Sequence, residues 1–80
     1  MSSFDVRRAG QPGDIPSLAS FPMPEEPEPT DKQIKDARKA AANTACARSL
    51  DGHRYDVLLV AGDRMFPVYE YRNGVRRRSR

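Results

Sequence analysis

The clearest chemistry in this 80-residue sequence lies in its arginine-rich last segment. Five of the last nine residues are arginine, with no acidic residue among them: Arg72, Arg76, Arg77, Arg78 and Arg80. Guanidinium groups bind phosphates and carboxylates, so this pattern predicts contact with a nucleic-acid backbone or with an acidic protein surface. Tyr69 and Tyr71 come just before, at strand spacing, and aromatic side chains beside arginines on a sheet can stack bases.

The formal net charge of +3 conceals an asymmetry along the chain. Residues 1–30 carry two basic against five acidic residues, whereas residues 31–80 carry twelve against six. An acidic first part and a basic second part can attract each other, or they can address two different partners.

Few residues of the chain could form a catalytic or metal site. One cysteine, Cys46, and one histidine, His53, are too few for a four-ligand zinc site, and a single cysteine excludes a disulfide within the chain. A Ser49–Asp51–His53 triad can be written down, but residues so close in sequence seldom converge with catalytic geometry. There is no glycine-rich phosphate loop. We therefore expect no enzyme, no cofactor and no metal site.

The sequence offers no pattern for export or for membrane insertion. The first ten residues, MSSFDVRRAG, lack the apolar core of a signal peptide. The longest apolar run, residues 57–61, is far too short to span a bilayer. We expect the protein to be cytoplasmic or incorporated in a virion, without membrane contact and not secreted by a signal peptide.

The elements that would position these residues are distributed unevenly. Six of the seven prolines precede Thr30, which disfavours a helix or a central strand in residues 1–29. We predict an extended Pro-rich N-terminal arm there, with spaced apolar side chains that dock into pockets of a partner: Phe4, Ile15, Leu18, Phe21 and Met23. A disordered tail and an arm folded back onto the chain's own sheet are the alternatives.

Residues 30–51 are predicted to form the single α-helix. Thr30 and Gln33 have the spacing of a capping box, six alanines give high helix propensity, and Gly52 is a C-terminal stop.

Residues 53–72 alternate as a β-hairpin would, with a tight turn at Gly62-Asp63, and Pro67 marks an edge strand or a bulge. Asn73-Gly74 is a strong hairpin signal, so residues 73–80 are a short third strand or a basic tail. The expected fold is a small α+β structure: an extended arm, one α-helix, then a two- or three-stranded antiparallel β-meander.

The leading functional hypothesis is a non-enzymatic structural or accessory subunit of a large assembly, such as a minor or cementing protein of a virus or phage particle. Its arm would bind the protein subunits of that assembly. One alternative is a small RNA- or DNA-backbone-binding protein of a nucleoprotein complex, acting through its Arg-rich C-terminus. A second is a small phage-type inhibitor that binds and blocks a host protein. Self-association is a further option, because so small a core usually needs a partner or an oligomer.

Overall fold

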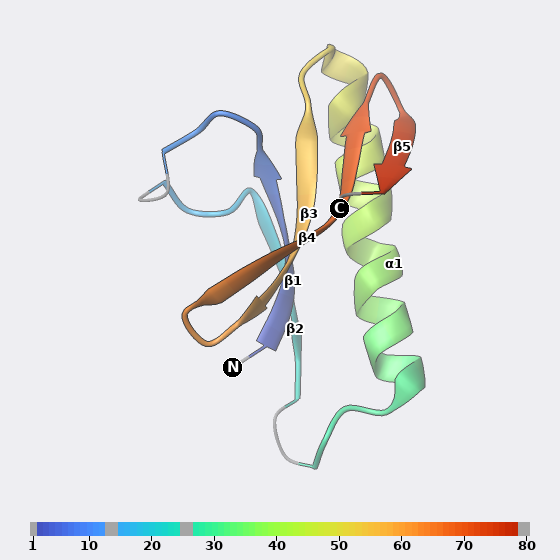
Figure 1. Cartoon of the computed structure of the whole chain (residues 1–80). Helices are drawn as coiled ribbons and strands as arrows, with labels where there is room; N and C mark the ends of the chain where they lie inside the picture. Colours follow the sequence, from blue (N-terminus) through green and yellow to red (C-terminus); the bar gives the residue numbers. More distant parts are fainter. Residues whose placement is uncertain (1, 13–14, 25–26, 79–80) are drawn as a thin grey trace.

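The computed structural model describes residues 2–12, 15–24 and 27–78. The elements are β1 (Ser2–Arg8), β2 (Ala19–Met23), α1 (Asp31–Arg48), the short 3₁₀ helix η1 (Ser49–Asp51), β3 (Tyr55–Ala61), β4 (Arg64–Arg72) and β5 (Val75–Arg78). The strands form one antiparallel sheet in the order β2-β1-β3-β4-β5. α1 lies along one face of this sheet (Figure 1). We call that face the helix side and the opposite face the open side.

The predicted helix is confirmed together with its capping box. The Thr30 hydroxyl accepts a hydrogen bond from the Gln33 backbone N–H at 3.1 Å, and the Gln33 side chain accepts from the Thr30 N–H at 2.8 Å. Both interactions satisfy donors that the first helical turn would otherwise leave free. The last predicted turn is the 3₁₀ helix η1, which ends at Gly52 in a left-handed conformation with φ 91°.

The predicted β-meander is confirmed, and both of its turns lie where the sequence indicated. Residues 62–63 and 73–74 connect β3 to β4 and β4 to β5. The pairing register between β3 and β4 shifts next to Val57 and Leu58, with Pro67 opposite Leu58. Because proline has no N–H to donate to a ladder, a bulge is a favourable place for it inside a sheet.

The sheet has five strands, so the prediction of two or three was too small, and the extended N-terminal arm is not confirmed. Residues 2–8 form β1 between β2 and β3, and residues 19–23 form the edge strand β2. Pro22 is tolerated because an edge strand needs ladder hydrogen bonds on one side only. The Asp5 carboxylate fastens the β1–β2 connection by accepting hydrogen bonds from the Ser3, Ser17 and Ser20 hydroxyls at 2.7, 2.8 and 2.8 Å.

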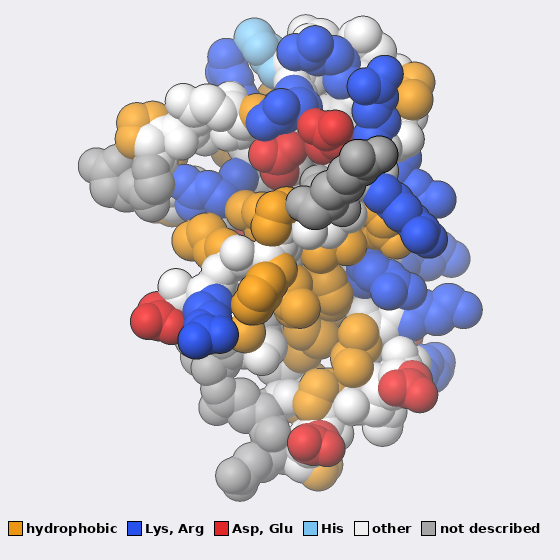
Figure 2. All heavy atoms as spheres, in the orientation of Figure 1, with side chains coloured by type: hydrophobic (Ala, Val, Ile, Leu, Met, Phe, Trp, Pro, Cys, Tyr) orange, Lys and Arg blue, Asp and Glu red, His pale blue; other side chains and the backbone are white. Residues whose placement is uncertain are grey.

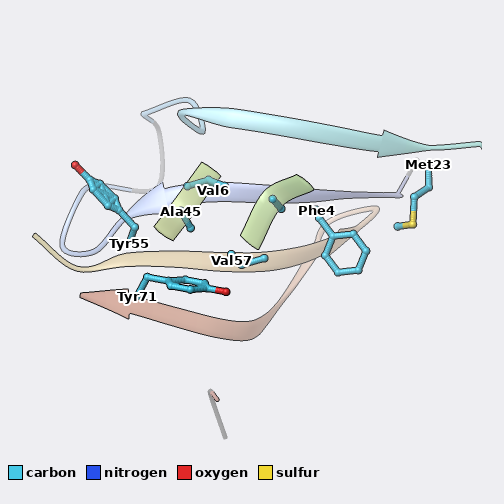
Figure 3. Packing of buried hydrophobic residues seen from close by; sticks show 8 residues of the cluster. Phe4, Val6, Met23, Ala45, Tyr55, Val57 and Tyr71 are labelled. Atoms are coloured by element: carbon cyan, nitrogen blue, oxygen red, sulfur yellow. The ribbon is translucent and has the colours of Figure 1, made fainter. Parts of the chain in front are cut away.

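The core lies between the sheet and α1 and draws on both halves of the chain. Its buried hydrophobic members come from β1, β2, α1, β3 and β4: Phe4, Val6, Met23, Ala41, Ala45, Tyr55, Val57 and Tyr71. Phe4 and Met23 lie near one end of the cluster and Tyr55 near the other (Figure 3). The small alanines of α1 allow its backbone to approach β1 closely, and this close packing holds the N-terminal strands in the fold.

Candidate phosphate-binding surface

The C-terminal arginines lie on both sides of the edge strand β5. Arg76 and Arg78 are opposite Tyr71 and Tyr69, on the helix side. Arg77 is opposite Glu70, on the open side. Side chains alternate along a strand, so the predicted cluster is divided between two faces that meet at one exposed edge. Arg80 lies outside the described residues.

The position of β5 is set by hydrogen bonds between the β4–β5 turn and the end of α1. The Asn73 N–H donates to the Ser49 carbonyl at 3.0 Å, and the Gly74 N–H donates to the Ser49 hydroxyl at 2.9 Å. That hydroxyl donates in turn to the Cys46 carbonyl at 2.7 Å. Ser49 is fully buried and occupied by these bonds, so it is not placed to act with His53 as a nucleophile.

Three cations of α1 face the same direction as β5. Residues one turn apart share a helix face, so Lys35, Arg38 and Lys39 lie on the same flank of α1 as Cys46. The Cys46 thiol donates to the Gly74 carbonyl at 3.5 Å, which shows that this flank points toward the β4–β5 turn. Figure 2 shows a column of Lys and Arg side chains along this side of the molecule.

We define the β5 surface as the helix-side cations of these two elements: Lys35, Arg38, Lys39, Arg76 and Arg78. Among the described residues, no carboxylate lies within 4.0 Å of any of them. Of the two acidic residues of the helix, Asp31 lies in the first turn, one turn before Lys35 and at the opposite end of α1 from the β4–β5 turn. Asp36 lines a shallow depression beside β2, on the opposite flank.

Tyr69 and Arg76 are in direct contact on this surface. The Arg76 guanidinium lies 4.9 Å from the centre of the Tyr69 ring. The Tyr69 ring in turn meets Tyr71 edge to face, with 6.4 Å between ring centres. Burial raises the pKa of the Tyr71 hydroxyl, and the nearby Arg76 guanidinium partly offsets that effect. A cation–π contact of this kind orders the arginine without neutralising its charge.

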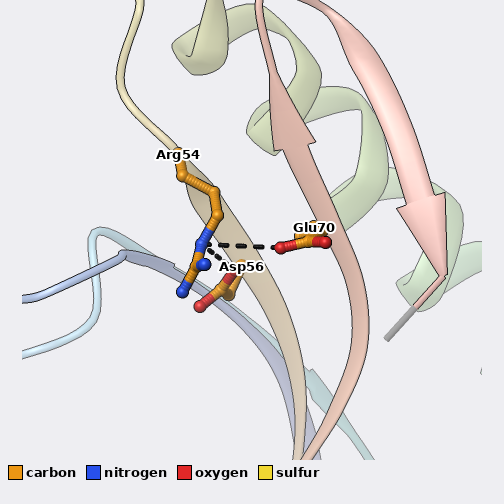
Figure 4. Close-up of polar contacts among 3 residues, drawn as sticks. All are labelled: Arg54, Asp56 and Glu70. Atoms are coloured by element: carbon orange, nitrogen blue, oxygen red, sulfur yellow. Dashed lines mark ion pairs between the residues drawn. The ribbon is translucent and has the colours of Figure 1, made fainter. Parts of the chain in front are cut away.

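The open side carries cations as well, but there they surround two acids. Arg7, Asp56, Glu70 and Arg77 lie directly opposite one another in a row across β1, β3, β4 and β5. The Arg54 Nε atom bridges the two acids, at 3.4 Å from Asp56 and 3.6 Å from Glu70 (Figure 4). Burial raises the pKa of the Asp56 carboxyl, Arg54 lowers it and the facing Glu70 raises it again.

Beside this row the open side is hollowed near the β4–β5 turn. The hollow has a volume of about 440 Å³, and its lining includes Arg54, Arg72, Arg77 and Glu70. Arg72 and Arg54 also border a second depression, next to Arg8 and His53. Positive charge therefore continues from the β5 surface around the edge of the sheet, although the acids reduce it there.

The predicted arm anchors lie in different environments. Phe4 and Met23 are 3 % and 7 % exposed and belong to the chain's own core. Phe21 packs against that core and is partly buried. Ile15 and Leu18, in the β1–β2 connection, remain 39 % and 40 % exposed. Ile15 and Leu18 are therefore the most exposed of the predicted anchors, and Phe21 lines an open depression between β2 and α1.

Sequence reasoning singled out the tail arginines and missed the three cations of α1 that accompany them. Their spacing carried a signal, because lysine and arginine at positions 35, 38 and 39 recur with the period of a helix. Which flank of α1 would face β5 was not readable, since it depends on the strand order of the sheet.

Comparison of the chain with protein-family models, with curated proteins and with solved structures finds no match. In the described ranges, no helix has the length and apolar character needed to cross a membrane. No group of three or more potential metal-ligating side chains occurs among the same residues.

Proposed function

We propose that this protein binds the phosphate backbone of a nucleic acid through the β5 surface. The observation that carries the proposal is the placement of five cations on the helix side of β5 and on the flank of α1 that faces the β4–β5 turn, without a carboxylate of the described chain within 4.0 Å of them. A row of cations suits a polyanion better than a single small anion, because each phosphate contact contributes separately to the binding free energy.

The charge of the whole molecule supports the same ligand. The net charge is +3 and the pI is about 9.4, and the acids that lower this charge lie mainly elsewhere. Asp5, Asp56 and Glu70 point to the open side, as their register with neighbouring residues shows. A polyanion that approaches β5 from the helix side therefore meets attraction with little opposition.

Binding should be measured by fluorescence anisotropy with labelled oligonucleotides longer than the roughly 4–16 nucleotides that small binding domains cover. We expect the logarithm of the association constant to fall linearly with the logarithm of salt concentration. The double variant Arg76→Ala/Arg78→Ala should bind more weakly. Its salt slope should be shallower by about 0.7 for each lost phosphate contact if the ligand is single-stranded.

The matched control is Arg48→Ala/Arg64→Ala, which also removes two positive charges. Both residues are exposed, and neither belongs to the β5 surface. The control should keep nearly the wild-type salt slope. An equal loss of affinity in both variants would show that binding depends on net charge alone. If a polyglutamate peptide competes for binding as effectively as an unlabelled oligonucleotide does, the surface binds acidic proteins instead.

We keep one second proposal, an accessory subunit of a larger assembly, because Ile15 and Leu18 are exposed together in the β1–β2 connection. Under this proposal the chain sediments with its assembly when it is isolated from its native source. Ile15→Ser/Leu18→Ser should then release it while the isolated chain keeps its stability. If that variant still sediments with the assembly, Ile15 and Leu18 are not its anchors.

A further inference from the structure

We infer that the nucleic acid bound by the β5 surface is single-stranded and that its bases pack against an apolar shelf beside that surface. The inference rests on the proposed function and adds the ligand class. The shelf consists of residues of β3 and β4 on the helix side: Leu59, Phe66, Val68 and Tyr69. Single-strand binding proteins commonly pair a basic track for phosphates with aromatic side chains for bases.

Phe66 is the exposed aromatic residue of the shelf. It lies directly opposite Leu59, whose side chain packs against the core, so Phe66 also points to the helix side. Even so, 47 % of Phe66 is exposed. An aromatic ring held on a strand and half open to solvent is available for stacking.

The shelf is open because α1 does not cover the whole sheet. α1 contacts β1 and β2 more extensively than β4. Figure 2 shows hydrophobic side chains in the middle of the view, next to the column of Lys and Arg side chains. Within the shelf, the Tyr69 ring contacts the Arg76 guanidinium. Apolar and basic surfaces therefore lie next to each other, as a single strand with splayed bases requires.

Arg76 and Tyr69 connect the shelf to the cations. Tyr69 is paired with Arg78 across β4 and β5, and its ring is covered on one face by the Arg76 guanidinium. The planar guanidinium is itself a stacking surface for a base. In a duplex the bases already stack on each other and cannot reach Phe66. The shelf therefore selects an unpaired strand.

The open side does not offer the same combination. By register and burial, all six aromatic residues of the chain lie on the helix side. On the open side, the cations Arg54 and Arg77 are accompanied by Asp56 and Glu70. We accordingly place the single strand on the helix side.

The absence of tryptophan from the chain permits a direct test. Phe66→Trp introduces one tryptophan on the shelf. Met65→Trp introduces one at the neighbouring residue, which is 53 % exposed and points to the open side. Single-stranded RNA, single-stranded DNA and a DNA duplex of equal length should be titrated into each variant, with tryptophan fluorescence and oligonucleotide anisotropy recorded together.

We expect saturable quenching of Phe66→Trp by the single strands, no quenching by the duplex, and little change in Met65→Trp. Phe66→Ala should weaken single-strand binding by about tenfold and Phe66→Tyr should restore it. The titrations with single-stranded RNA and single-stranded DNA show which sugar is preferred. Strong anisotropy signals without quenching, or equal binding of duplex and single strand, would overturn the inference and leave phosphate binding intact. If no oligonucleotide changes the anisotropy, the proposed nucleic-acid binding itself is wrong.

Discussion

Val6 on β1 lies directly opposite Val57 on β3, and both side chains are 0 % exposed. This pair joins two strands that are about fifty residues apart in sequence. It places residues 2–8 inside the fold of this chain. A side chain so fully enclosed cannot be shortened without leaving a cavity.

Val6→Ala should therefore lower the free energy of unfolding by about 2 kcal/mol, because it removes two buried carbon atoms and opens a cavity. Val75→Ala is the control: Val75 is 63 % exposed, and the change there should stay within about 0.5 kcal/mol. Urea denaturation of the three proteins measures both effects.

Amide hydrogen exchange of the isolated chain offers an independent check of the same pair. Residues 2–8 should exchange as slowly as residues 55–61, because they share one ladder. Fast exchange and undispersed signals for residues 2–8 would mean that the N-terminal segment is free in solution. The docking-arm hypothesis would then return.

A second prediction concerns the hydrogen bond from the Tyr55 hydroxyl to the Asp51 carboxylate. That bond, followed by one from the His53 N–H, holds the pKa of Asp51 below its usual 3.8. The stabilisation is therefore fully present above pH 3.8 and is lost as the pH falls through the folded-state pKa. The same bond raises the pKa of Tyr55 above 10.0, so stability is lost again as the pH rises through that raised value.

Tyr55→Phe should accordingly be less stable than the wild type at neutral pH, and the difference should shrink at both extremes of pH. Tyr69→Phe is the control, because the Tyr69 hydroxyl makes no hydrogen bond among the described residues. The free energy of unfolding of both variants and of the wild type should be measured by urea denaturation at a series of pH values. A constant difference across that series would show that the bond does not couple to either ionisation.

The third prediction concerns Gly74, which has a φ of +79° in the turn that leads into β5. Gly74→Ala should cost about 1–2 kcal/mol, because a side chain is strained in this left-handed region. The added Cβ would also lie 3.1 Å from the Leu50 side chain. Gly62→Ala is matched to it, with a φ of +63° in the β3–β4 turn and no atom within 4 Å of the added Cβ.

Both glycine variants should lose similar stability in urea denaturation. Only Gly74→Ala should weaken oligonucleotide binding, because its strain displaces the start of β5 and with it Arg76 and Arg78. Wild-type binding by Gly74→Ala would show that the geometry of this turn does not matter for the β5 surface.

Local interactions made the second half of the chain predictable. The capping box at Thr30 and Gln33 and the turns at 62–63 and 73–74 involve residues within a few positions of each other. Their conformations follow from hydrogen bonds and φ preferences that do not depend on the rest of the fold. The alternation of Phe4 and Val6 also had strand periodicity, but the prolines that follow outweighed it.

By itself, the sequence determined the helix, the meander and the concentration of arginine near the end of the chain, because these depend on neighbouring residues. The tertiary structure decided that β1 lies inside the sheet, between β2 and β3, which local patterns do not predict because β1 pairs with β3 across a separation of about fifty residues. It also decided the candidate site. The strand order placed β5 at an edge of the sheet, so that Arg76 and Arg78 lie on the helix side together with the flank of α1 that carries Lys35 and Lys39 and with the exposed ring of Phe66.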